Sequence, residues 1–159
     1  MPDRRTPFLL SGEGETIREF LDYLRESIVL KATGLDEVSA RRSTVPSGTT
    51  LLGLVKHLTT VEIAWFQYAF AGSARAVPSD ELDPTDTVES VVSAYRAAIE
   101  QSNKIVDDCD ELQRLCARAF RTPEPMSLRW VLVHMVEETG RHAGHADIIR
   151  EQIDGQTGR

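Results

Sequence analysis

Four long segments of this sequence carry apolar residues at spacings of three and four, the period of an amphipathic helix. The first extends from about Glu15 to Ala32 and stops at Gly34, with apolar residues at Ile17, Phe20, Leu21, Leu24 and Ile28. No segment shows the alternation of apolar and polar residues that is typical of a strand. The pattern therefore predicts an all-α fold.

The second helix is expected after the stretch "PSGTT", where Ser47 or Thr49 can cap it, and it ends at Gly72. The link that follows, "GSARAVPSDELDPT", is long and contains Pro78 and Pro84. Because a connection of that length can cross the end of a bundle, two neighbouring helices can run in the same direction.

The third helix is expected to begin at "DTVE", with Asp86 as its cap and Glu89 three residues later as a near capping box. It continues to about Cys109. The fourth follows "PEPMS", with Ser127 as its cap, and ends near Gly155. Four helices of this length predict a four-helix bundle.

The composition fits one domain over residues 1–159, since 41% of the residues are hydrophobic and 27% are charged. A net charge of −7 without a long Lys and Arg cluster disfavours nucleic acid as a partner. Charged residues or histidine interrupt every apolar run before the length of a membrane span. With no secretory signal apparent at the start, we expect a cytoplasmic protein without a membrane partner.

The stretch "HMVEETGRHAGHAD" in the fourth helix holds the most informative side chains. On a helix of 3.6 residues per turn, Glu138 lies about 40° from His142, and Val131 and Ile149 lie about 20° from it. Glu138 and His142 therefore fall within the apolar stripe. A buried carboxylate needs a partner. A divalent metal would satisfy both side chains, because residues at i and i+4 present their ligand atoms side by side.

A third ligand would have to come from another helix, and His57, at the edge of the second helix's apolar face, is the histidine left to supply it. The three side chains together favour a metal site, with a metal-free pair of Glu138 and His142 as the alternative. His134 is expected at the edge of the core or beside a ligand. His145 could be a fourth ligand, a hydrogen-bond partner of a ligand or a general base.

The stretches "KHLTTVEIAWF" and "LRWVLVHMVEETGRHAGHADIIRE" resemble the DinB-like superfamily, which includes bacillithiol S-transferases and mycothiol-dependent maleylpyruvate isomerase. The resemblance implies a bundle of up-down-down-up arrangement that binds a divalent metal, zinc or nickel. It implies His57, Glu138 and His142 as ligands. A glutamate replaces the first histidine of the family's usual pair, which is similar to the isomerase and favours a harder metal site.

The resemblance also implies the leading function, a metal-dependent transferase that joins a low-molecular-weight thiol such as mycothiol or bacillithiol to a small electrophile. His145 is its candidate base or hydrogen-bond partner of a ligand. The rival function is a non-catalytic, stress-associated metal-binding protein that acts as a homodimer. In that case the apolar stretch "AWFQYAF" could supply the subunit interface.

Overall fold

The structure is a computed structural model that describes residues 6–7 and 12–157. Its elements are α1 (Glu13–Ala32), the short α2 (Glu37–Arg41), α3 (Leu51–Glu62), the π-helix η1 (Ile63–Phe70), α4 (Val88–Asp107) and α5 (Leu128–Asp154). Within the described ranges there is no strand, and the only β-type pairing is an isolated bridge between Leu115 and Ser127. The predicted all-α fold is confirmed.

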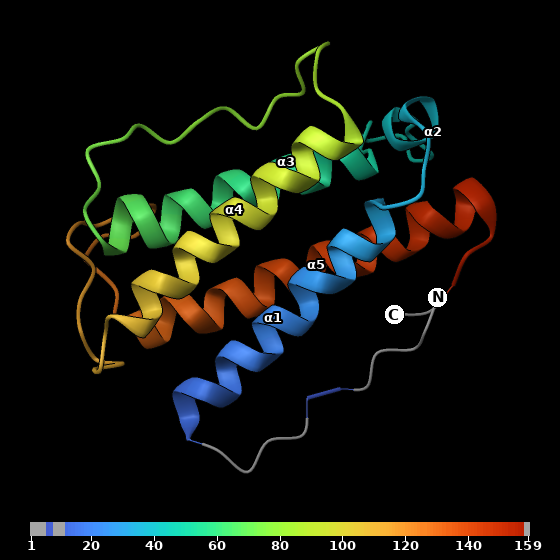
Figure 1. The fold of residues 1–159 in the computed structure, drawn as a ribbon. Coiled ribbons are helices and arrows are strands. Elements are labelled where there is room, and N and C mark those ends of the chain that lie inside the picture. The colour runs from blue at the N-terminus through green and yellow to red at the C-terminus, as the bar shows by residue number, and fades with distance from the viewer. Residues whose placement is uncertain (1–5, 8–11, 158–159) are drawn as a thin grey trace.

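Two layers make up the bundle: α1 lies beside α5, and α3 with η1 lies beside α4 (Figure 1). Arg129 near the start of α5 pairs with Glu13 at the start of α1, so these two helices run in the same direction. Arg18 near the start of α1 pairs with Asp107 at the end of α4, so α4 runs opposite to α1. In Figure 1, α3 likewise runs opposite to α1 and α5.

The helices begin within a few residues of the predicted starts, but two of the predicted caps are wrong. Thr50 caps α3, because its hydroxyl accepts a hydrogen bond from the Gly53 N–H. Thr87 caps α4 and forms a capping box with Ser90 rather than with Glu89. These threonines lie directly before the first helical turn, where the capping geometry requires them.

Asp86, the cap predicted for the third helix, has a different role. Its carboxylate accepts a hydrogen bond from the Asp83 N–H at 2.7 Å and pairs with the Lys56 ammonium at 2.6 Å. By contrast, the cap predicted for α5 is confirmed: Ser127 accepts from the Trp130 N–H. Gly155 ends α5 in the left-handed conformation with φ 77°, which glycine adopts without strain.

The second predicted helix is not a single α-helix. After Glu62 the backbone continues as η1, in which the hydrogen bonds span one residue more than in an α-helix. The wider turn lets Trp65, Phe66, Ala69 and Phe70 all face the interior, where each is buried. The sequence pattern also missed α2, a helix of five residues that Asp36 caps.

The core divides into two apolar clusters along the bundle. One gathers the end of α1 with α2, α3 and the last turns of α5, and the other gathers η1 with the first turns of α5. Arg25 of α1 and Glu62 of α3 are both buried and pair with each other. No helix in the described part of the chain is long and apolar enough to cross a membrane.

Candidate metal centre

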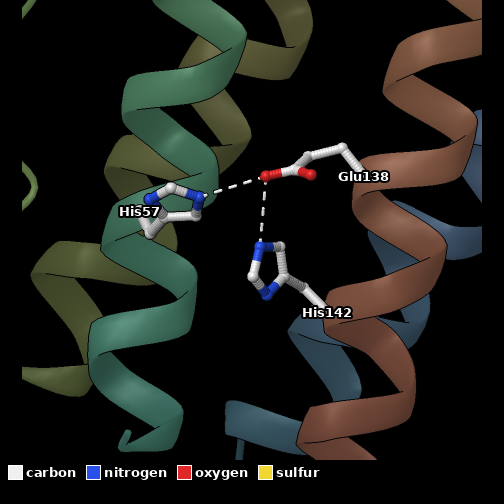
Figure 2. Close-up of side chains that lie close together, drawn as sticks. All are labelled: His57, Glu138 and His142. Carbon is white, nitrogen blue, oxygen red and sulfur yellow. Dashed lines mark hydrogen bonds and ion pairs between the residues drawn. The ribbon is translucent and has the colours of Figure 1, made fainter.

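His57, Glu138 and His142 meet between α3 and α5, which run side by side in opposite directions. His57 points from α3, and the other two point toward it from successive turns of α5 (Figure 2). One ligand atom from each side chain lies within 4.8 Å of the other two, and among the described residues no other group of three such side chains does so. The helical geometry predicted from the sequence therefore brings these three residues together.

The two distances from Glu138 to the histidines fit a metal ion. Glu138 Oε1 lies 3.3 Å from His57 Nε2 and 3.2 Å from His142 Nε2. Ligand atoms about 2.0–2.1 Å from a tetrahedral zinc ion lie about 3.3–3.4 Å from one another. Two imidazole nitrogens and one carboxylate oxygen are also donors that zinc and nickel accept. The three donors leave at least one position of such an ion for another ligand.

Each histidine has an outer partner at its second ring nitrogen. His57 Nδ1 lies 2.7 Å from Asp80 Oδ2, and His142 Nδ1 lies 3.4 Å from His145 Nδ1. Both histidines therefore direct Nε2 toward the Glu138 carboxylate and Nδ1 away from it. Partners of this kind orient the imidazole rings that bind metal ions in proteins.

The environment keeps Glu138 ionised although its side chain is only 15% exposed. Burial acts to raise the pKa of Glu138, but the hydrogen bond to His57 and the nearby His142 and Arg141 outweigh it, so the pKa is lowered. Burial also lowers the pKa of His142, which favours the neutral ring. A carboxylate and a neutral imidazole are the protonation states in which these groups bind metal ions.

The remaining two histidines occupy different positions. His145 is exposed, and its ring contacts that of His142 at a centroid distance of 5.5 Å. His134 is half-buried in an aromatic cluster, where it stacks on Trp130 and meets Trp65 edge to face. Burial lowers the pKa of His134. Neither belongs to the group of three facing donors.

Asp80 is the part of this centre that the sequence analysis missed. It lies in the connection between η1 and α4, 23 residues after His57, where no helical period relates the two positions. The hydrogen bond from His57 lowers the pKa of Asp80. The sequence holds only a weak signal for this contact, an acidic residue in a long connection that must pass back along α3.

Comparisons with known proteins agree with the fold. The sequence profile of the mycothiol S-transferase family matches residues 16–155, a range that includes all three facing donors. No curated protein matches the chain.

Two solved structures are similar in fold. A DinB-like protein from Bacillus cereus ATCC 10987 is 18% identical, with a TM-score of 0.67 over 87% of this chain and 91% of its own. A conserved protein from Enterococcus faecalis is 16% identical, with a TM-score of 0.63 over 92% of this chain and 99% of its own. With the profile match over most of its length, the chain belongs to the mycothiol S-transferase family of DinB-like proteins.

Proposed function

We propose that this protein is a metal-dependent thiol transferase. In this proposal His57, Glu138 and His142 hold a divalent ion, zinc or nickel, and a thiol of the mycothiol or bacillithiol type is joined to a small electrophile. The observation that carries the proposal is the convergence of the three donor atoms within 4.8 Å, inside the range that the family profile matches.

The exposure of the site suits a reaction with small molecules. The side chain of His57 is 31% exposed, whereas those of Glu138 and His142 are 15% exposed. The donors are thus held by the bundle while one side stays open to solvent. A metal bound to three protein ligands with an open position can bind a thiol and lower its pKa.

The overall change is the replacement of a sulfur–hydrogen bond by a sulfur–carbon bond. The thiol releases its proton to solvent, and the sulfur electron pair forms the new bond to the electrophilic carbon. Either a leaving group departs with its bonding electrons or a double bond accepts them and is then protonated. His57, Glu138 and His142 would hold the ion, and with it the sulfur, in a fixed position near the surface of the bundle.

His145 acts in this proposal as the partner of His142 rather than as the base. A neutral imidazole carries a hydrogen on only one of its two ring nitrogens. A His142 ring that offers its Nε2 lone pair to a metal therefore carries that hydrogen on Nδ1. The Nδ1–H then donates toward His145 Nδ1, 3.4 Å away. This arrangement occupies the lone pair that His145 would need in order to accept a proton at that nitrogen.

The rival function, a non-catalytic homodimer, receives less support. Five of the seven residues in the apolar stretch "AWFQYAF" are buried within the chain itself: Ala64, Trp65, Phe66, Ala69 and Phe70. They pack in the core and leave little apolar surface on this stretch for a second subunit.

A thiol-consumption assay tests the proposal. Protein loaded with zinc or with nickel is mixed with a generic aromatic electrophile and with mycothiol, bacillithiol or glutathione in turn. We expect thiol loss with at least one of the first two thiols, and none above background for metal-stripped protein or for Glu138→Gln. Glu137→Gln is the matched control, because the neighbouring Glu137 is exposed and pairs with Arg141 instead. Equal thiol loss with and without metal would overturn the proposal.

A further inference from the structure

Asp80 contacts the candidate metal centre from outside the two helices that supply the donors. It lies in the connection between η1 and α4, and its Oδ2 is 2.7 Å from His57 Nδ1. We propose that Asp80 is a positioning residue for His57: its carboxylate fixes the His57 tautomer that offers Nε2 to the metal. The connection between η1 and α4 is then part of the metal site. The inference rests on the proposed metal site.

The hydrogen positions on His57 carry the argument. Carboxylate oxygens lie at both ring nitrogens: Asp80 at Nδ1, and Glu138 at Nε2 at 3.3 Å. A neutral imidazole can donate a hydrogen bond at only one of its nitrogens. The shorter contact places the hydrogen on Nδ1, where it donates to Asp80. In this tautomer the Nε2 lone pair faces Glu138 Oε1, so a divalent ion placed between these two atoms would be bound by both of them.

The connection is held where this contact needs it. Lys56, the residue before His57, pairs with Asp86 at 2.6 Å. Arg41 of α2 donates to the backbone carbonyls of Asp83 and Asp86. Two adjacent residues of α3 therefore fasten two points of the connection, Asp80 and Asp86. The carboxylate of Asp80 is 48% exposed, so the hydrogen bond to His57 is its main restraint within the described structure.

Two consequences follow for metal binding. Without the Asp80 carboxylate, the His57 ring is free to turn and to place its hydrogen on Nε2. The metal then binds only the fraction of molecules in which Nε2 has a free lone pair and faces the site, which weakens the apparent affinity. Partners of metal-binding histidines typically change metal affinity by about 10–100-fold. A metal on Nε2 also strengthens the Nδ1–H donor, so loading should hold the connection more firmly.

The first test compares zinc affinities by competition with a chromophoric chelator. We expect Asp80→Ala to bind zinc about 10–100-fold more weakly than the native chain. Asp80→Asn keeps an oxygen acceptor without the charge, so it should fall between the two. Glu81→Ala is the matched control, because it removes the same charge one residue along, from an exposed side chain with no described partner in the site. Its affinity should equal that of the native chain.

A second readout separates positioning from a general effect on stability. Nitrogen NMR of the histidine rings should show His57 with its hydrogen on Nδ1 in the native chain, and a mixture of tautomers in Asp80→Ala. Amide hydrogen exchange in residues 73–87 should slow on zinc loading in the native chain and in Glu81→Ala, but not in Asp80→Ala.

The outcomes separate this inference from the proposed function. If the native chain binds zinc and Asp80→Ala binds it equally well with an unchanged tautomer, the role of Asp80 is overturned and the metal site stands. If Asp80→Ala and Glu81→Ala weaken binding equally, the effect is one of charge and the positioning role is overturned. If the native chain binds neither zinc nor nickel, both the proposed function and this inference fail.

Discussion

Arg25 and Glu62 form a fully buried ion pair in the centre of the bundle. The Arg25 guanidinium donates through Nε to Glu62 Oε1 at 2.8 Å and through Nη2 to Glu62 Oε2 at 2.7 Å. Arg25 has two further acceptors, Asp22 and Asn103, whereas Arg25 is the only described partner of the Glu62 side chain. Loss of the pair therefore leaves Glu62 without a described partner, whereas Arg25 keeps two acceptors.

This asymmetry predicts the effect of breaking the pair. Arg25→Met leaves the Glu62 carboxylate buried without a partner, which should reduce the free energy of unfolding by about 3–5 kcal/mol. Glu62→Gln should cost less, because Arg25 keeps Asp22 and Asn103. The double variant Arg25→Met with Glu62→Met should recover most of the loss, since neither member of the pair is then left as an unpaired buried charge. Urea unfolding of the three variants measures this, and additive losses in the double variant would contradict it.

Gly144 provides a second prediction, on stability alone. A Cβ added at this position in the middle of α5 would meet no atom within 4 Å. Because glycine weakens a helix interior, Gly144→Ala should raise the free energy of unfolding by about 0.5–1 kcal/mol.

Gly155 gives the matched control for that variant. Its φ of 77° strains any residue with a side chain, so Gly155→Ala should lower the stability. Thermal unfolding compares the two substitutions directly. A Gly144→Ala protein that is less stable than the native chain would mean that the space beside α5 is filled.

Tyr95 predicts how stability changes at alkaline pH. Its ring is completely buried, no described residue forms a hydrogen bond with its hydroxyl, and burial raises its pKa well above 10.0. The unfolded chain releases this proton at about pH 10, while the folded chain retains it. The free energy of unfolding should therefore fall as the pH rises through this range.

Tyr95→Phe removes that dependence and the unpaired hydroxyl together. We expect a stability equal to or above that of the native chain near neutral pH, and an advantage that grows above about pH 10. Urea unfolding at a series of pH values checks the trend. Tyr68→Phe is the comparison variant, because it removes a tyrosine hydroxyl from a half-buried ring that packs against Arg118 outside the core.

His145 is expected to support the centre without being a ligand. We expect the His145→Ala protein still to bind a stoichiometric amount of metal. Its affinity for the metal should fall by less than the loss of a ligand causes, because the contact between His145 and His142 is 3.4 Å long and exposed. Metal titration of His145→Ala beside His142→Ala measures the difference. Complete loss of metal in His145→Ala would instead make His145 a ligand.

The helices and the pairing of Glu138 with His142 could be predicted because both follow from one periodicity, whereas His57 was reached as the remaining histidine on another helix and through the family resemblance. Residues on an α-helix repeat every 3.6 positions, so the spacing of Glu138 and His142 already placed them on one face. The buried pair was also within reach of this reasoning: Glu62 lies about 20° from Val55 and about 40° from Leu58 on the same helix. Glu62 was not among the predicted site residues, although it is a carboxylate on an apolar face.

Other features depend on contacts that no period encodes. The five residues of α2 are too few to show a helical pattern, and η1 has the same apolar composition as an α-helix. The contact of Asp80 with His57 depends on the path of a connection without regular structure. Such a path is set by tertiary contacts such as the ion pair of Lys56 with Asp86. These contacts depend on the three-dimensional arrangement of the helices and leave no pattern in the sequence.

The metal content of untagged protein tests the central claim most directly. Purified native chain, His57→Ala, Glu138→Ala and the control Glu137→Ala are measured by elemental analysis after removal of loosely bound ions. The account predicts about one divalent ion per chain in the native protein and in Glu137→Ala, and loss of that ion in His57→Ala and Glu138→Ala. A native chain that holds no metal, or full retention in both ligand variants, would contradict it.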